Sequence, residues 1–324
     1  MLTLARNQTD ETVVLKGVSG HPRVENERDV LKRFQNRTPY LRPLIDEIKE
    51  PSEPATIALK YLDDHLLNAS KTRVLSRQEI KYVSRRILEA LSELHRDDYV
   101  HTGITLSSLV HYRDTNYLPT DVKPDNVFVN YREGNVRFSD VQLGDLGGTY
   151  PADSKWAQEG TPVGAPMWTS PEVIMETPWN TATDIWSFGS LVCLDSYHST
   201  ASYVANSFKV ISLIYGGDFN LFRPRTVPYG HEEYGLEVLK RQFKYFGPFP
   251  AKYEEITSQE TIAAILYLME VIPQSDMTPF YRTTKREVSK DDKEFIGKMM
   301  QVDWRDRPTA SELLNDRWFG DDNN

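Results

Sequence analysis

The spacing of apolar and polar residues predicts a strand-rich segment followed by a helical one. Residues 12–16, TVVLK, are largely β-branched and predict a strand, as do residues 55–62, ATIALKYL. Between them, the charged run ENERDVLKRF at residues 25–34 predicts a helix. Helical periodicity dominates beyond Ser76. We therefore expect a small strand-rich lobe and a large helical lobe, connected in the segment LDDHLL around Asp63.

Two capping boxes mark predicted helix starts. Ser76 is followed three residues later by Glu79, and Thr309 is followed in the same way by Glu312. After the first box, apolar residues recur on one helical face: Ile80, Val83, Ile87, Leu88, Leu91 and Leu94. Such a stripe predicts a long helix that packs on the core of the large lobe.

Composition narrows the class of protein. The chain has 324 residues, of which 39% are hydrophobic and 26% charged, and this balance is typical of a soluble globular protein. A net charge of −9 argues against a nucleic-acid or anionic-membrane partner, since either favours a basic surface. No apolar run long enough for a membrane span and no signal peptide pattern is seen, and the single cysteine, Cys193, cannot form an internal disulfide. We expect a cytoplasmic or nuclear protein.

The segment DVKPDN, residues 121–126, has the residue types that a phosphoryl-transfer site requires. Asp121 can take the proton of an attacking hydroxyl, Lys123 can neutralise the transferring phosphate, and Asn126 can offer an amide oxygen to Mg²⁺. The alternative is an ordinary polar turn before the strand-like VFVNY at residues 127–131. The combination of six residues favours the catalytic interpretation.

Further motifs follow in a fixed order along the chain. They are Val13-Val14-Leu15-Lys16, Glu27 in NERDVL, Asp145-Leu146-Gly147, Ser170-Pro171-Glu172, Asp184-Ile185-Trp186-Ser187-Phe188-Gly189 and Arg307 in RDRPTA. Together with DVKPDN, this set resembles the eukaryotic protein kinase family over nearly the whole chain. A lysine two residues after the catalytic aspartate is similar to the serine/threonine branch. The segments FGPFP and GAPMWTSPE resemble protein kinase domain proteins of filamentous fungi.

The resemblance implies a bilobal α+β fold with a small β-rich lobe and a large α-helical lobe. Their expected limits are residues 1–62 and 63–320, with a tail at 321–324. Four residues are expected to have structural roles: His101 beneath the catalytic loop, Glu172 with its partner Arg307, and Asp184 at the start of the central helix.

The resemblance also implies the cofactors and the reaction. Lys16, held by Glu27, would position the phosphates of ATP, and the ATP-binding residues would include Tyr61 and Leu62. Asn126 and Asp145 would hold Mg²⁺. Asp121 would orient the Ser or Thr hydroxyl of a protein substrate, while Lys123 stabilises the transferred group. The protein would thus be a serine/threonine kinase.

The metal-binding aspartate has two candidates. Asp140 follows Asn126 at a distance closer to the family's usual loop length. Asp145 follows the alternating strand VQL and precedes a glycine that allows the backbone to turn, and for this reason we prefer it. Asp140 is then expected to be a solvated hairpin residue.

Two departures from the family pattern favour a different class of function, a pseudokinase that acts as a binding scaffold. No G-x-G-x-x-G stretch precedes Lys16, although that loop covers the ATP phosphates with backbone N–H groups in the family. Ala165 stands where the family often has a threonine that bonds to the catalytic aspartate. Retention of Lys16, Asp121, Asn126 and Asp145 favours an active ancestor.

Two segments of 18 residues interrupt the motifs. Residues 103–120 separate His101-Thr102 from Asp121, whereas the family has its histidine and aspartate almost adjacent. Residues 192–209 interrupt the apolar central helix, and joining Leu191 to Val210 restores the pattern WSFGSLVISLIYGG.

Surface loops are one explanation, because loop closure entropy grows slowly with length. Our hypothesis is that both segments are translated introns, since their codons can contain splice signals and the removal of each restores a motif. On this hypothesis the chain itself could be an inactive translation product of a kinase gene.

Overall fold

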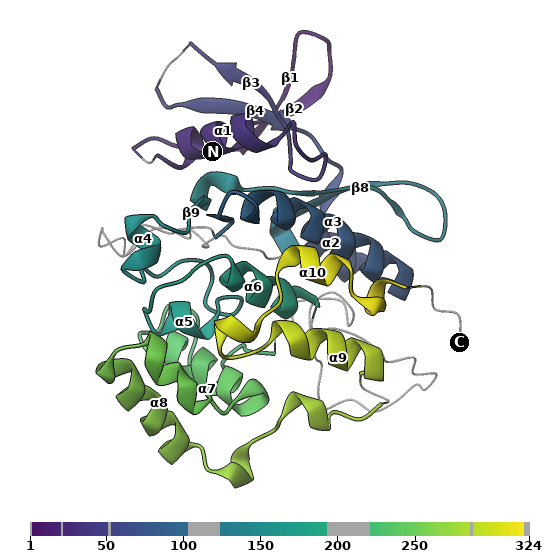
Figure 1. Ribbon diagram of the computed structural model, residues 1–324. Coiled ribbons are helices and arrows are strands. Elements are labelled where there is room, and N and C mark those ends of the chain that lie inside the picture. Colours follow the sequence, from purple (N-terminus) through teal and green to yellow (C-terminus); the bar gives the residue numbers. More distant parts are fainter. Residues whose placement is uncertain are drawn as a thin grey trace.

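A four-stranded antiparallel sheet and one helix form the smaller lobe, at the top of Figure 1. The sheet has the order β1-β2-β4-β3, with β1 at Leu2–Arg6, β2 at Thr12–Gly17, β3 at Leu44–Ile48 and β4 at Thr56–Lys60. The structure, a computed structural model, describes residues 2–20, 22–50, 53–102, 124–192, 221–285 and 288–320. The strands predicted at 12–16 and 55–62 correspond to β2 and β4.

Helix α1, Arg23–Phe34, lies beside this sheet (Figure 1). Its buried face consists of Val24, Glu27, Val30, Leu31 and Phe34. Four of these side chains are apolar and the fifth is a carboxylate, which must find a partner because a buried unpaired charge is costly. The predicted helix at 25–34 is therefore confirmed, and one of its buried positions is chemically unusual.

The larger lobe is mainly helical and lies below the sheet in Figure 1. Its α-helices are α2 at Leu66–Thr72, α3 at Arg77–His95, α4 at Lys155–Gln158, α5 at Pro171–Ile174, α6 at Ala182–Val192, α7 at Tyr234–Phe246, α8 at Gln259–Val271, α9 at Lys290–Met299 and α10 at Ala310–Leu314. Both predicted capping boxes are present, with Ser76 opening α3 and Thr309 opening α10. The two-lobed architecture expected from the sequence is confirmed.

Short strands bring the functional motifs to the top of the large lobe. One sheet has the order β5-β7-β8, formed by Asp64–His65, Val127–Tyr131 and Phe138–Leu143, and a second pairs β6 at Tyr99–Val100 with β9 at Tyr150–Pro151. Short 3-10 turns are η2 at Pro124–Asn126, η3 at Leu146–Gly148, η4 at Ala251–Ile256, η5 at Gln274–Asp276, η6 at Phe280–Arg282, η7 at Trp304–Asp306 and η8 at Arg317–Phe319. Asn126 thus immediately precedes β7, and Asp145 follows β8.

Helix α6 forms the buried axis of the large lobe. Every residue from Thr183 to Val192 is buried, including Trp186 and Phe188, so the helix has no solvent-facing side over this stretch. A helix that is buried all round must be surrounded by other elements, and α3, α9 and η7 all contact it. The first proposed inserted segment, residues 103–120, lies outside the described residues, and so does the second, residues 192–209, apart from Val192 at the end of α6.

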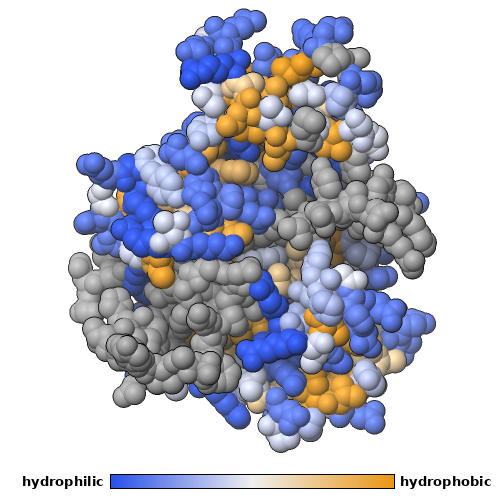
Figure 2. Space-filling model, turned by 180° about the vertical axis from the view of Figure 1, so that it is seen from behind, coloured by the Kyte–Doolittle hydropathy of each residue, from blue (hydrophilic) through white to orange (hydrophobic). Residues whose placement is uncertain are grey.

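The surface keeps some apolar area. Figure 2 shows apolar surface over the small lobe, where Leu2 and Leu4 of the edge strand β1 are 67% and 64% exposed. None of the helices in the described part of the chain has the length and apolar character that crossing a bilayer requires.

Candidate active site

Lys16 lies at the centre of the candidate site. Its Nζ atom is 2.6 Å from Oε2 of Glu27 and 2.6 Å from Oδ1 of Asp145. The three residues come from β2, from α1 and from the turn after β8, so the contact joins the two lobes. A lysine near a strand end, which by itself predicts only a solvated side chain, is here a mostly buried cation between two carboxylates.

The electrostatic environment keeps Lys16 and Asp145 charged. Burial alone would lower the pKa of Lys16, but attraction by the Glu27 and Asp145 carboxylates outweighs it, and the pKa is raised. Burial would likewise raise the pKa of Asp145, yet the neighbouring cations Lys16 and Arg23 hold it well below its usual range. Nη2 of Arg23 lies 3.4 Å and 3.5 Å from the two oxygens of that carboxylate.

Backbone conformation also distinguishes Asp145. It has φ 58° and ψ 56°, in the left-handed region that few non-glycine residues adopt. Two residues later, a Cβ atom at Gly147 would stand 2.8 Å from the carbonyl oxygen of Arg23, so only glycine permits this close approach to α1. The strained turn therefore directs the Asp145 carboxylate toward Lys16 while the following turn packs on the helix.

Helix α1 holds that turn with two side chains. Oε1 of Glu27 accepts a hydrogen bond of 3.2 Å from the backbone N–H of Leu146, while its other oxygen binds Lys16. Nδ2 of Asn26 donates to the carbonyl oxygens of Gly147 and Thr149, at 3.1 Å and 3.0 Å. The position of α1 and that of the Asp145 turn are therefore coupled.

Asn126 reaches the same region through the backbone. The N–H of Gly144 donates to the Asn126 carbonyl oxygen at 2.9 Å, and Asn126 is buried. Asp140, the other aspartate considered, lies in β8, where it faces Asn130 and accepts a 2.9 Å hydrogen bond from its side chain. The structure thus places Asp145, rather than Asp140, beside Lys16 and close in the chain to the Gly144–Asn126 contact.

The oxygen donors fit a magnesium ion. Mg²⁺ in phosphoryl-transfer sites binds one or two carboxylate or amide oxygens together with phosphates and waters. The ionised Asp145 carboxylate and the Asn126 amide have the required chemistry. Among the residues that the structure describes, no three His, Cys, Asp or Glu side chains are grouped as a metal site.

Four further predicted residues belong to the nucleotide-binding and catalytic set. Tyr61 is 36% exposed and Leu62 is buried, and the two follow β4 directly at the junction between the lobes. The predicted catalytic residues Asp121 and Lys123 lie outside the described residues.

His101 is completely buried under the Asp145 turn. Its Nε2 lies 3.0 Å from the Gly144 carbonyl oxygen, so Nε2 carries the proton and donates. Its backbone N–H donates to Oδ2 of Asp184 at 2.8 Å, and the same oxygen lies 2.9 Å from Nε2 of His95. Burial lowers the pKa of His101 more than the nearby carboxylates raise it. The sequence predicted His101 and Asp184 as structural residues but did not suggest that they touch.

Glu172 and Arg307 form a buried, two-pronged ion pair. Nη1 and Nη2 of Arg307 lie 2.6 Å and 2.8 Å from the two carboxylate oxygens, and both side chains are almost inaccessible. The guanidinium also lies over the ring of Trp186, 5.0 Å from its centre. The pair links α5 to the segment after η7, across the base of α6.

Sequence reasoning missed Arg23, Asn26, His95 and Arg42, all of which contact the site or the turns that form it. Each is a common polar residue in a helix or loop, for which an exposed position is the ordinary expectation. The only signal in the sequence is for Arg23, which lies four residues before Glu27 and so on the same side of the helix.

Comparisons with known proteins identify the family of the chain. Residues 3–203 match the family model described as protein kinase domain. Curated relatives include serine/threonine-protein kinase SMU1 of Mycosarcoma maydis, 26% identical over 49% of this chain and 18% of the relative. Serine/threonine-protein kinase 4 homolog A of Dictyostelium discoideum is 25% identical over 59% of this chain and 37% of the relative. The chain therefore spans well under two thirds of the length of these relatives.

A solved structure, the yeast RNA Pol II CTD kinase CTDK-1 complex, has a similar fold. Its matching chain superimposes with a TM-score of 0.68 at 18% identity, over 99% of this chain and 90% of that one. On the family model, which matches more than half of the residues, and on its serine/threonine kinase relatives, this chain belongs to the eukaryotic protein kinase family.

Proposed function

We propose that the chain transfers the γ-phosphoryl group of ATP to a Ser or Thr hydroxyl of a protein substrate. The observation that carries this proposal is the position of Lys16 between Glu27 and Asp145, at 2.6 Å from each carboxylate. A scaffold that only binds partners has no need of a buried ammonium between two carboxylates, since such a cluster is costly to desolvate.

Each residue of the site then has a role that follows from its chemistry. Lys16 supplies a compact cation for the phosphates, and Glu27 fixes its position from the buried face of α1. Asp145 and Asn126 would hold Mg²⁺, which neutralises charge on the phosphates when it is bound. Asp121 and Lys123 are assigned from the sequence alone, as the group that orients the substrate hydroxyl and the cation for the transferred group.

Both lobes contribute residues to the proposed site. We place the boundary at Leu62, so that residues 1–62 contribute Lys16 and Glu27 and residues 63–320 contribute Asn126, Asp145 and the substrate-facing loop. The residues between the lobes, Tyr61 and Leu62, are proposed to contact the nucleotide.

Radiolabelled phosphate transfer to a generic protein substrate tests the proposal. The full chain is compared with a version that lacks residues 103–120 and 192–209, and both are also supplied with an upstream glycine-rich segment. We expect transfer that requires Mg²⁺ and is lost when Lys16 is replaced by Met. The matched control is Lys290→Met, because Lys290 is an exposed lysine of α9 with a side chain 74% accessible.

The outcomes separate the alternatives. Activity confined to the shortened version would mean that the spliced product of the gene is a kinase and that the full chain is inactive. ATP binding without transfer in either version would contradict the proposal and favour a scaffold.

A further inference from the structure

Arg42, in the loop between α1 and β3, is a buried arginine that no part of the proposed function uses. Only 6% of its surface is exposed. Its backbone N–H donates to the Leu143 carbonyl oxygen at 2.8 Å, and its side-chain Nε donates to the Lys60 carbonyl oxygen at 2.8 Å. Its guanidinium carbon lies 4.2 Å from the centre of the Phe128 ring. The residue is therefore held at three points, two of which involve its side chain.

These contacts place Arg42 at the proposed nucleotide site. Lys60 immediately precedes Tyr61 and Leu62, and Phe128 lies two residues after Asn126. A Cβ atom built on Gly144, the residue before Asp145, would be 3.3 Å from Cδ of Arg42. The Glu27 and Asp145 carboxylates are close enough to attract the guanidinium. Arg42 thus touches the segments that carry the proposed nucleotide-binding and metal-binding residues.

The guanidinium has hydrogen-bond donors to spare. Burial lowers the pKa of Arg42 to about 10, and the attraction of Glu27 and Asp145 offsets only part of that effect. Nε is satisfied by Lys60. Within the described residues no hydrogen bond is found for either terminal nitrogen of Arg42, and neither is among the buried polar atoms that lack a partner, so both remain accessible. A guanidinium with accessible donors can bind an acceptor on a ligand.

The chemistry of the donors selects the ligand. An arginine side chain has donors and no acceptor, and its commonest base-specific partner is the pair of acceptors O6 and N7 of guanine. Adenine has an amino group in place of O6, which opposes one of those donors. The Lys60 carbonyl, an acceptor that such an amino group could use, is already bound to Nε of Arg42.

We propose that Arg42 is a specificity-determining residue which makes the nucleotide site accept 6-oxopurine triphosphates, GTP and ITP, as phosphoryl donors alongside ATP. The inference rests on the proposed function, because it concerns the base of the same nucleotide. Phe128 supports the guanidinium from one side by its ring, and Lys60 fixes its rotation about Nε.

Direct titration of the full chain with ATP, GTP and ITP in the presence of Mg²⁺ tests the inference without any need for catalysis. We expect GTP and ITP to bind within about tenfold of ATP or more tightly, because one good arginine–purine contact changes affinity by about five- to 150-fold. ITP lacks the 2-amino group of GTP, so similar binding by the two identifies O6 and N7 as the recognised atoms.

Substitution assigns the effect to the residue. Arg42→Met keeps most of the side-chain volume and removes the hydrogen-bond donors. It should weaken the binding of GTP and ITP relative to that of ATP by about tenfold. The matched control is Arg241→Met in α7, where Nε also donates to a carbonyl oxygen, that of Leu221, at 2.8 Å and the guanidinium also lies over a ring, that of Tyr245. This control should leave the ratio of GTP and ITP affinity to ATP affinity unchanged.

Three results would overturn the inference. The first is a binding affinity of the unmodified chain for GTP and ITP that is more than tenfold weaker than its affinity for ATP. The second is an unchanged ratio of GTP affinity to ATP affinity in the Arg42→Met variant, whose folding is checked by circular dichroism. This result would exclude Arg42 as the origin of the base specificity. Failure of all three nucleotides to bind would refute the proposed function itself, and the inference with it.

Discussion

Glu27 holds Lys16 at 2.6 Å with one carboxylate oxygen and accepts the Leu146 N–H at 3.2 Å with the other. One buried side chain of α1 thereby fixes both the cation of β2 and the turn that carries Asp145. Any displacement of α1 would break both contacts together, so the helix position and the geometry of the site are coupled.

Glu27→Gln tests this coupling. The amide keeps the shape of the side chain but removes the negative charge, which leaves Lys16 with Asp145 alone. We expect the free energy of unfolding to fall by about 1.5–3 kcal/mol, as for the loss of a hydrogen bond to a charged group, and the affinity for Mg·ATP to fall with it. Urea denaturation and nucleotide titration measure the two effects. Exposed Glu159→Gln in the segment after α4 is the control, and equal behaviour of the two variants would contradict the assigned role.

The buried pair Glu172–Arg307 should be a major contributor to stability. Glu172→Gln leaves an uncompensated guanidinium in the interior, and we expect a loss of about 3–5 kcal/mol in unfolding free energy. The double variant Glu172→Gln with Arg307→Met should recover part of that loss, because the unpaired charge is then removed.

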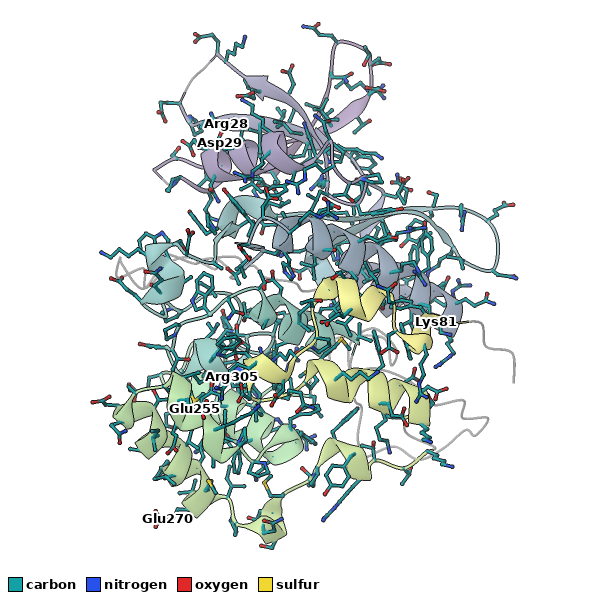
Figure 3. The ribbon with its side chains drawn as sticks, viewed as in Figure 1. Arg28, Asp29, Lys81, Glu255, Glu270 and Arg305 are labelled. Atoms are coloured by element: carbon teal, nitrogen blue, oxygen red, sulfur yellow. The ribbon has the colours of Figure 1, made fainter. Side chains whose placement is uncertain are left out.

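A surface pair gives the contrast for that experiment. Figure 3 shows Arg305 beside Glu255, with 2.7 Å between Nη1 and Oε2, and the Glu255 side chain is 63% exposed. Glu255→Ala should cost no more than about 1 kcal/mol, since exposed ion pairs contribute little. A loss for Glu172→Gln as small as that for Glu255→Ala would refute the importance of the buried pair.

His101 should make stability depend on pH between mildly acidic and neutral conditions. Burial lowers the pKa of His101 in the folded chain below its ordinary 6.5, so the unfolded chain binds a proton first as the pH falls. The stabilisation is fully present above pH 6.5 and declines progressively below it. His101→Gln retains a donor for the Gly144 carbonyl but does not titrate.

Urea denaturation at a series of pH values from about 5 to 8 measures this effect. The decline in stability toward acid should be shallower in His101→Gln than in the unmodified chain. His231→Gln, at an exposed histidine, is the control and should retain the original profile. An identical pH profile for the unmodified chain and His101→Gln would show that His101 does not set it.

The two inserted segments make a prediction at the level of the transcript. If residues 103–120 and 192–209 are translated introns, the dominant spliced message lacks both and encodes His101-Thr102 directly before Asp121. Sequencing that message is the measurement. The hypothesis fails if both segments are encoded there, and they are then loops of the protein.

Much of the fold and several site residues could be read from local patterns. Capping boxes at Ser76 and Thr309, the strand before Lys16 and the ordered motifs all involve residues a few positions apart, where backbone geometry links sequence to structure directly. The choice of Asp145 over Asp140 also began from a local argument, the strand and glycine on either side of it. The contact of Asp145 with Lys16 is the observation that now favours the same choice.

The contacts that make the site depend on the tertiary structure. Lys16 and Asp145 are 129 positions apart, and nothing local requires them to meet. Arg42 is the clearest case, because its residue type predicts exposure, yet the packing of Leu143, Lys60 and Phe128 around it places it inside. The sequence alone determined which chemistry was available and in which elements. Only the packing of the two lobes decided which charges lie together, since burial and pairing depend on neighbours distant along the chain.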